Sequence, residues 1–368
     1  MVDQTPMADR RTPLVMLVGS PRSGTTWLQT MLGSHEAIAT PQETDLFRMY
    51  YDPLVQAWRQ QIEGATDASS QRRRKGLPLV VSEAEFAASI RPLLDAVLDA
   101  ITRMKPTARV VIEKSPSHSI VVDTIHFVDP NARFVHIVRD GRDAAASMVA
   151  AHTDGWGARW APDSISNAAG RWRRHVIGAR KAAALGPDRY LEVRYEDFLG
   201  SNGAATLQSV FAFVGVDVGD DDARSILDEH HIERARSSAE VSSSLLIGGE
   251  LGDDPLVHAE PPGFIRRGGS GGWRATWSVR DRQAFAESGG DLLVELGYES
   301  DSTWIGAPAR PSIVVRAVRR MSNETALGLR RLADRLDGSP PRRQRRRVAG
   351  DDDFGPPGVA TDPGDPTT

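Results

Sequence analysis

The residues best suited to chemistry lie in the loop Gly-Ser-Pro-Arg-Ser-Gly-Thr-Thr at positions 19–26. An apolar run that predicts a strand precedes the loop, and residues 27–32 carry apolar side chains at helical spacing. In a strand–loop–helix turn, the backbone N–H groups and the helix N-terminus together attract an anion. Arg22 adds a fixed positive charge, and Thr25 and Thr26 add hydroxyl donors. The pattern predicts a phosphate-binding loop.

This loop is similar to a Walker A motif but departs from it in one place. Walker A has a lysine directly after its second glycine, where this chain has Thr25 after Gly24. The cation is instead Arg22, inside the loop. Because no lysine can reach a β/γ phosphate pair, we predict binding of a nucleotide phosphate without ATP hydrolysis. An ordinary strand-to-helix turn with a capping hydroxyl is the structural alternative.

A second loop carries the groups for a second phosphate. Arg139 follows another apolar run, and Ser147 lies eight residues further on, within a segment with helical spacing. A guanidinium offers a two-pronged donor and serine a hydroxyl, so both side chains could bind one anion. The alternative is a solvated turn in which Asp140 and Asp143 cap the helix and Arg142 lies at the surface.

A third candidate is the glycine-rich basic segment 264–273, which contains Arg266, Arg267 and Gly268. Such a loop is typical of a flexible clamp on an anion, and a plain linker is the alternative. It ends a polar stretch, 237–272, whose Gly, Ser and Pro content predicts a long loop. Loops of that length are uncommon unless they are functional or disordered.

The elements that must position these groups alternate along the chain. Apolar runs predict strands at 14–18, 109–112, 133–138 and 189–193. Helical patterns occur at 25–32, 84–102, 118–128, 143–152, 166–184, 206–214, 224–235 and 279–296. This alternation predicts an α/β fold, a P-loop-type parallel sheet flanked by helices on both faces. Ligands bind such sheets at the carboxyl ends of the strands.

Composition excludes several classes of protein. The chain has 368 residues, 40% of them hydrophobic, and a formal net charge of −4. That balance argues against a nucleic-acid partner, which would require a surplus of Lys and Arg. Because cysteine is absent, disulfides, thiolate metal sites and a cysteine nucleophile are excluded. We separately predict no metal, because the Mg²⁺-linked arrangement of a Walker A loop is not evident around Gly24. No apolar run approaches the ~20 residues of a membrane span, and no secretion signal is evident, so we expect a cytoplasmic protein.

The folded unit is predicted to be a single domain over residues 12–305. Residues 306–336 include a possible basic amphipathic helix at 314–336, and residues 337–368 read as a disordered tail of Pro, Arg, Asp and Gly. The basic C-terminal region is a candidate for contact with a membrane surface. Nothing in the sequence indicates an oligomeric state.

Taken together, these loops resemble the family of sulfotransferases that use 3′-phosphoadenosine 5′-phosphosulfate (PAPS). Residues 21–28 resemble the family's 5′-phosphosulfate loop, and Arg139 and Ser147, with seven residues between them, match its 3′-phosphate motif. Residues 264–273 resemble its C-terminal loop, although Gly272 stands where Asp is common. The resemblance covers residues 14–277 and fits a bacterial member. It implies nucleotide contacts from Arg22, Ser23, Gly24, Thr25, Thr26, Trp27, Arg139, Ser147, Tyr195, Arg266, Arg267 and Gly268.

The resemblance implies transfer of a sulfonate group from PAPS to a hydroxyl of a carbohydrate, lipid or other small-molecule acceptor. Such an in-line displacement needs cations against the leaving charge, a positioned acceptor oxygen and a base. Arg22 is the first candidate cation. Lys114, in Glu-Lys-Ser-Pro, is the second, and it resembles the catalytic lysine of the tyrosylprotein-type branch.

Two residues are candidates for the base. Glu43 lies 21 residues after Arg22 and matches the glutamate that serves as base in tyrosylprotein-like sulfotransferases. His118 is the alternative, since cytosolic-type members use the histidine of a Lys-Thr-His-Leu-Pro motif. In this chain Pro116 occupies that histidine's place and His118 comes two residues later, so we prefer Glu43.

Two other functions compete with this interpretation. A P-loop kinase or NTPase-like protein would need a lysine after Gly24, which this chain lacks. A non-catalytic nucleotide-binding member is the other possibility. The presence of Arg22, Lys114, Arg139 and Ser147 argues against it.

Overall fold

The computed structural model describes residues 12–66, 75–230, 240–261, 263–264 and 268–306. The chain divides into two compact units, Met1–Trp304 and Ile305–Thr368, and the fold described here is that of the first. The predicted helix 314–336, the tail 337–368 and the pair Arg266 and Arg267 lie outside the described residues. The proposed domain 12–305 and the membrane contact therefore stay predictions.

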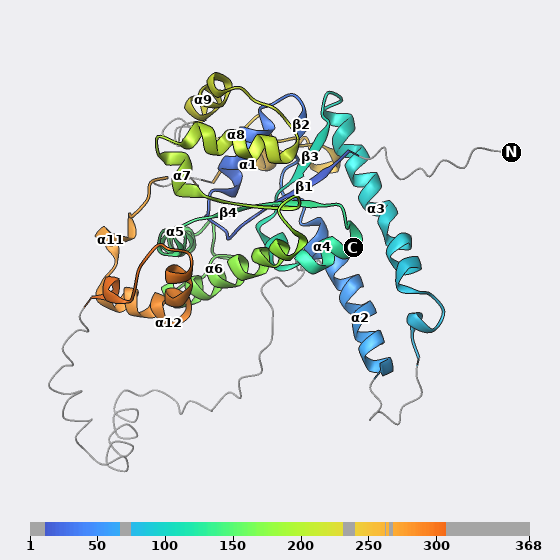
Figure 1. The fold of residues 1–368 in the computed structure, drawn as a ribbon, viewed down its shortest axis with the longest axis horizontal. Coiled ribbons are helices and arrows are strands. Elements are labelled where there is room, and N and C mark those ends of the chain that lie inside the picture. The colour runs from blue at the N-terminus through green and yellow to red at the C-terminus, as the bar shows by residue number, and fades with distance from the viewer. Residues whose placement is uncertain (1–11, 67–74, 231–239, 262, 265–267, 307–368) are drawn as a thin grey trace, which may run out of the picture. The chain divides into compact units, whose positions relative to one another are not determined.

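A five-stranded parallel sheet forms the centre of the first unit (Figure 1). Its strands are β1 (Leu14–Val18), β2 (Ile38–Ala39), β3 (Val110–Glu113), β4 (Arg133–Val138) and β5 (Tyr190–Arg194), in the order β2-β3-β1-β4-β5. The four predicted strands are confirmed. Strand β2 was not predicted, because two residues are too short to form a recognisable run.

The strands are continuous apolar runs in the sequence because both faces of the sheet are buried. All five residues of β1 are buried, and its side chains alternate between two cores. Leu14, Met16 and Val18 point into one core, whereas Val15 and Leu17 point into the other. Parallel strands covered on both faces have this pattern.

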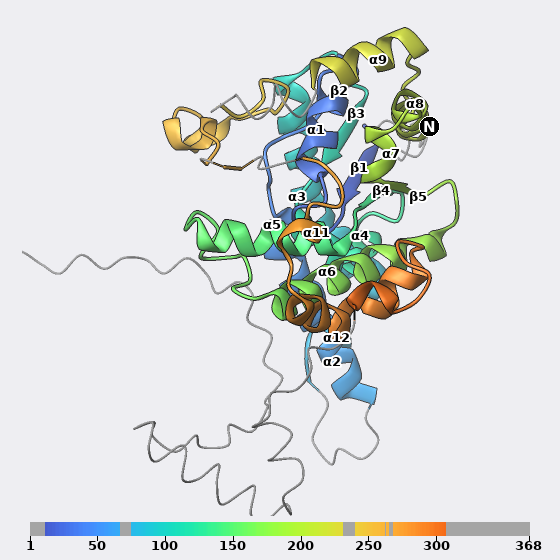
Figure 2. The ribbon, with the colours of Figure 1, turned by 90° about the vertical axis from the view of Figure 1, so that its left-hand side faces the viewer.

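Helices cover both faces of the sheet, as predicted (Figures 1 and 2). One face packs against α2 (Asp52–Thr66), α3 (Glu83–Met104), α4 (Val122–Val128) and α6 (Ile165–Arg180). The other packs against α1 (Thr25–Gly33), α7 (Tyr195–Leu199), α8 (Gly203–Val214) and α9 (Asp220–Glu229). A third apolar cluster joins α5 (Gly141–Thr153), α11 (Trp273–Thr276) and α12 (Val279–Glu295) to α6. None of the helices that are described is long and apolar enough to cross a bilayer.

Several helix boundaries differ from the sequence prediction. The predicted helix 118–128 is a 3-10 turn, Pro116–Ile120, followed by α4, because Val121 leaves helical geometry at φ −125° and ψ 30°. The predicted helix 224–235 starts earlier, at Asp220. Its acidic first turn is favoured by the helix dipole.

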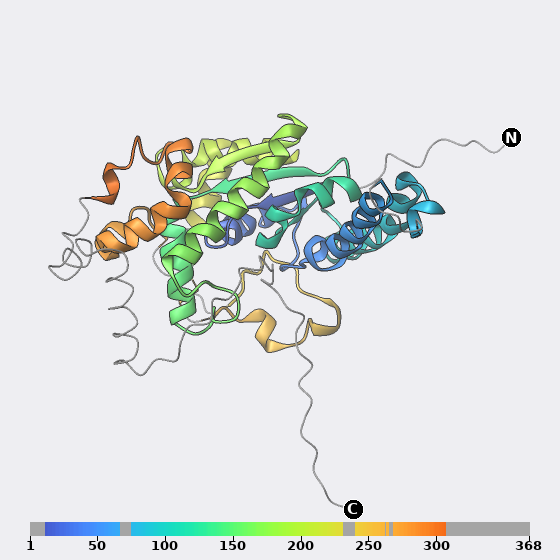
Figure 3. The ribbon, with the colours of Figure 1, turned by 90° about the horizontal axis from the view of Figure 1, so that it is seen from below.

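Two further segments depart from the predicted secondary structure. A π-helical turn, Phe47–Tyr51, leads into α2, and neither was predicted. The predicted loop 237–272 is tied down within its described part, residues 240–261, by bridges between Pro41 and Leu246 and between Glu240 and Ala259. This segment is drawn in gold in Figure 3.

Candidate active site

The loop between β1 and α1 turns sharply at two residues with positive φ. Arg22 has φ 68°, and Gly24, the residue before α1, has φ 91°. A Cβ at Gly24 would lie 2.5 Å from the ring of Tyr195, so only glycine fits there. Left-handed geometry at a residue other than glycine costs about 1–3 kcal/mol and occurs mostly at functional sites. The turn aims the Arg22 side chain and the start of α1 into the same space.

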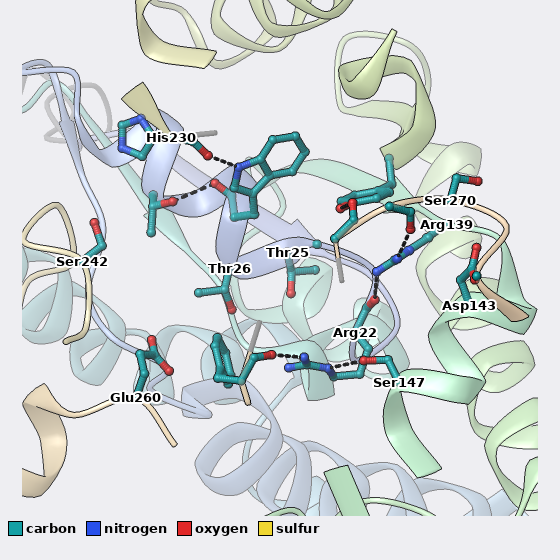
Figure 4. A pocket seen from close by; sticks show the side chains of 18 of the residues that line it. Arg22, Thr25, Thr26, Arg139, Asp143, Ser147, His230, Ser242, Glu260 and Ser270 are labelled. Carbon is teal, nitrogen blue, oxygen red and sulfur yellow. Dashed lines mark hydrogen bonds between the residues drawn. The ribbon is translucent and has the colours of Figure 1, made fainter. Parts of the chain in front are cut away.

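Arg22 reaches across to the second loop. Its Nε donates a hydrogen bond to Ser147 Oγ at 3.0 Å, and its guanidinium also bonds to the carbonyl of Phe264 (Figure 4). The same guanidinium lies 4.9 Å from the Phe264 ring centroid and 5.3 Å from that of Trp156. The first two predicted anion loops are therefore in direct contact.

Arg139 connects all three loops. It donates hydrogen bonds to the carbonyl of Arg22 at 3.0 Å and to the carbonyl of Gly269 at 2.8 Å (Figure 4). Its guanidinium lies 4.3 Å from the ring centroid of Tyr195. The Nε of Arg139 and the Oγ of Ser23 are buried without a hydrogen-bond partner among the described residues. Arg139 lines the cavity between the loops and Ser23 does not, so of these two groups only the Arg139 Nε is placed to donate to a ligand there.

Asp143, a candidate helix cap from the sequence, instead binds the backbone of the third loop. Asp143 accepts hydrogen bonds from the N–H groups of Gly271 at 2.6 Å and Trp273 at 3.1 Å. Burial raises the pKa of Asp143, and those two hydrogen bonds oppose the shift. Tyr195 adds a hydrogen bond from its hydroxyl to the carbonyl of Gly268. Burial likewise raises the pKa of Tyr195, so its phenol stays protonated.

The surface position considered for Arg142 is wrong. Arg142 is buried, and its guanidinium bonds to the carboxylates of Asp140 and Glu299. It stacks 4.1 Å from the ring centroid of Trp273 and 4.8 Å from that of Trp304. Asp140 does cap α5, as considered, by accepting from the Arg142 N–H at 2.9 Å. Arg142 therefore packs against the end of the third loop, at Trp273.

A cavity of about 730 Å³ lies between the three loops. That volume falls within the range of about 300–1,000 Å³ typical of small-molecule sites. The predicted nucleotide contacts that line it are Arg22, Gly24, Thr25, Thr26, Trp27, Arg139, Ser147, Tyr195 and Gly268. Trp27 is fixed at the wall by a hydrogen bond from its Nε1 to the carbonyl of His230 at 2.7 Å, and it packs edge-on to Tyr195.

The candidate cation Lys114 and the candidate base Glu43 lie together beside the first turn of α1. Lys114 directly follows β3, and its Nζ bonds to the Glu43 carboxylate and to Thr26 Oγ1, the latter at 3.1 Å. The Lys114 side chain is 1% exposed, whereas that of Glu43 is 42% exposed. Lys114 thus reaches the cavity wall through Thr26.

The structure places the alternative base, His118, in a buried pair with Glu113. The His118 Nδ1 lies 2.5 Å from Glu113 Oε2, and its Nε2 accepts the N–H of Phe47 at 3.1 Å. Burial alone would raise the pKa of Glu113, but side-chain hydrogen bonds from His118, Thr44 and Ser115 hold it below its usual range. Both ring nitrogens of His118 are therefore used within the protein.

Three acidic residues that line the cavity, Glu229, Glu240 and Glu260, were not found from the sequence. Glu260 lines the cavity and belongs to no motif, because it lies in the segment predicted as a loop (Figure 4). Burial raises the pKa of Glu260, the charges of Lys114 and Arg22 lower it, and Glu43 raises it. Glu260 thus adds a carboxylate within electrostatic reach of both candidate cations.

The fold and these loops define a P-loop-type α/β protein with a cavity that Arg22 and Arg139 line. A family model described as "Sulfotransferase family" matches residues 13–220, and the chain belongs to that family, as predicted. It is 25% identical over 214 residues to Protein-tyrosine sulfotransferase 2 of Gallus gallus, covering 56% of this chain and 52% of that protein. With Protein-tyrosine sulfotransferase 1 of Homo sapiens it shares 27% identity over 137 residues, 37% of this chain and 34% of that one.

The chain spans about half or less of the length of these curated relatives. Among solved structures, it is similar to a mouse sulfotransferase complexed with PAP, at a TM-score of 0.46 and 16% identity over 87% of this chain and 90% of that one. It is also similar to the sulfotransferase domain from the curacin biosynthetic pathway, at a TM-score of 0.45 and 16% identity over 78% and 99% of the two chains.

Proposed function

We propose that this protein is a PAPS-dependent sulfotransferase that transfers a sulfonate group to a hydroxyl of its acceptor. The observation that carries the proposal is the contact between the two arginine-bearing turns. Arg22 bonds to Ser147 at 3.0 Å, and Arg139 bonds to the Arg22 carbonyl at 3.0 Å, beside one cavity. A single nucleotide with phosphates at its 3′ and 5′ positions could therefore engage both turns.

The residues present fit this co-substrate. Arg139 Nε is a buried donor without a partner among the described residues, and a phosphate oxygen in the cavity would satisfy it. The positive charges of Arg22 and Arg139 and the helix N-terminus at Thr25 complement an anion. PAPS supplies the sulfonate when bound. We propose that Arg266 and Arg267, which lie outside the described residues, close over the 3′-phosphate.

The proposed chemistry assigns a role to each charged group near Thr26. Arg22 and Lys114 stabilise the negative charge that grows on the leaving oxygen. Glu43 takes the hydroxyl proton while the acceptor oxygen bonds to sulfur and the bond between sulfur and the phosphate oxygen breaks. The electron pair of that bond leaves with the phosphate. We favour Glu43 over His118 because Glu43 is part-exposed, whereas both nitrogens of His118 are engaged.

The acceptor is proposed only as a class. The curated relatives are protein-tyrosine sulfotransferases, so a tyrosine phenol joins carbohydrate, lipid and other small-molecule hydroxyls as a candidate.

A two-part experiment tests the function. Thermal shift compares 3′,5′-diphosphoadenosine (PAP), the product left after transfer, with ATP and Mg²⁺. Turnover is then measured with ³⁵S-labelled PAPS and a panel of tyrosine peptides, glycans, lipids and a cell lysate. We expect PAP to stabilise the protein and label to transfer, with loss of transfer in Arg22→Ala. Preference for ATP with Mg²⁺ would favour the kinase or NTPase alternative. PAP binding without any transfer would favour a non-catalytic member.

A further inference from the structure

A buried hydrogen-bond network joins the segment after Glu43 to the segment around Lys114. We call it the clamp and define it as Glu113, Ser115 and His118 bonded to residues 44–47. Its bonds run from Thr44 Oγ1 to Glu113 Oε1 (2.7 Å), from the Asp45 N–H to Ser115 Oγ (3.0 Å) and from the Phe47 N–H to His118 Nε2 (3.1 Å). Ser115 Oγ in turn donates to Glu113 Oε1 at 2.8 Å, which closes the network.

The clamp holds its segment in a strained conformation. Asp45 has φ 49°, in the left-handed region, which aspartate adopts more often than most residues other than glycine but still uncommonly. Ser117 donates a hydrogen bond to the Asp45 carboxylate, and Ser115 accepts the Asp45 N–H. Such a conformation persists only where the surroundings over-determine it. The chain two residues beyond Glu43 is therefore fixed rather than free to rearrange.

The identity of the histidine tautomer follows from its partners. A backbone N–H can only donate, so the His118 Nε2 that accepts the Phe47 N–H carries no proton. The proton is on Nδ1, which donates to the Glu113 carboxylate. With both nitrogens committed and its side chain 0% exposed, His118 has no lone pair left for an acceptor hydroxyl.

We propose that Glu113 and His118 are positioning residues that fix Glu43 against Lys114. The inference rests on the proposed function. Lys114 stands in the chain between the clamp residues Glu113 and Ser115, and Glu43 precedes Thr44, so the clamp constrains both ends of the Glu43–Lys114 contact. A misplacement of about 1 Å in a reacting group can cost about 10²-fold in rate. Glu113, Ser115 and His118 do not line the nucleotide cavity.

Glu113→Gln tests the proposal with little change of volume. If the new amide donates to His118 Nδ1, the imidazole proton moves to Nε2 and faces the Phe47 N–H. If the amide is flipped, its NH₂ faces the hydroxyls of Thr44 and Ser115, which then lose their acceptor. Either orientation therefore weakens the clamp, because it leaves a buried donor without its acceptor. We expect kcat to fall about 10²-fold, while the KM for PAPS and the Kd for PAP stay within about twofold.

A matched control exists at β4 and β5. Glu192 accepts from the Tyr190 hydroxyl at 2.7 Å and lies 3.3 Å from the buried His136, so it too pairs with a histidine, and it does not line the cavity. Glu192→Gln is expected to lower thermal stability and leave kcat unchanged. Thr44→Val, which removes one bond of the clamp, is the milder variant should Glu113→Gln fail to fold, and we expect about a tenfold loss of kcat.

Amide hydrogen exchange at Asp45 and Phe47 gives a readout that needs no turnover, and we expect both amides to exchange faster in Glu113→Gln. If wild-type protein fails to transfer label from PAPS, the proposed function fails while exchange still tests the clamp. Unchanged exchange at both amides would overturn the clamp itself. A kcat within threefold of wild type, or a kcat loss that Glu192→Gln reproduces, would overturn the positioning role.

Discussion

Replacing Lys114 with methionine should move activity and stability in different directions. The side chain is 1% exposed, and its ammonium bonds to Glu43 and Thr26. Methionine has a similar length but no charge. Loss of one preorganised donor at a developing negative charge costs about 2.7–4 kcal/mol, or about 10²–10³ in kcat. We therefore expect Lys114→Met to lose transfer by that factor.

The stability of Lys114→Met should be retained or raised. Removing one member of a buried ion pair normally leaves a costly unpaired charge, but Glu43 is 42% exposed and can be hydrated. An apolar side chain of similar volume then removes the desolvation cost of the buried ammonium, so we expect no loss of Tm. A loss of about 1 kcal/mol would lower Tm by about 2–4 °C in a domain of about 150–250 residues. Differential scanning calorimetry and ³⁵S transfer measure both quantities on the same preparation. A kcat within threefold of wild type would refute the reasoning. A Tm lowered by 5 °C or more would also refute it, because about 2–4 °C corresponds to about 1 kcal/mol.

Three further predictions concern the cavity. Arg139→Ala should raise the KM for PAPS at least about tenfold and leave kcat within threefold, because the guanidinium that the proposal assigns to a phosphate is lost. Steady-state kinetics test this with Arg189→Ala as the control, since Arg189 is a part-buried arginine outside the cavity; a fall in kcat instead would contradict the prediction. Gly24→Ala should abolish PAP binding by calorimetry, since its Cβ would meet the Tyr195 ring at 2.5 Å; wild-type affinity would contradict this. Burial raises the pKa of Glu260 above its ordinary 4.5, so it gains its negative charge at a higher pH than an exposed glutamate. PAP affinity should therefore fall as pH rises through that raised pKa, and Glu260→Gln should flatten the dependence; identical pH profiles would argue against the assignment.

Sequence patterns predicted the sheet and the three loops because their signals are local. Strand β1 is apolar at every position, since both its faces are buried, and the loop at 19–26 follows it directly. The same reasoning placed Arg139 at the carboxyl end of β4, and the structure brings it into contact with Arg22. Strand β2 was missed because its two residues are stabilised by pairing with β3 and not by any pattern of their own.

Long-range contacts account for what the sequence did not predict. Glu113 and Thr44 are 69 residues apart, and no spacing rule links them. His118 was a candidate base as long as its partners were unknown, and its buried bonds to Glu113 and Phe47 give it a different environment. Glu260 lies in a segment without motif or periodicity, so only the folded chain reveals that it faces the cavity.

The central claim, that both arginine-bearing turns bind one nucleotide, is tested most directly by calorimetry with PAP and 5′-AMP, which lacks the 3′-phosphate. Wild type and Arg139→Ala are each titrated with both ligands. The account predicts one PAP per chain, and a loss of affinity in Arg139→Ala that appears with PAP and vanishes with 5′-AMP. An equal loss with both ligands, or a second PAP bound per chain, would contradict it.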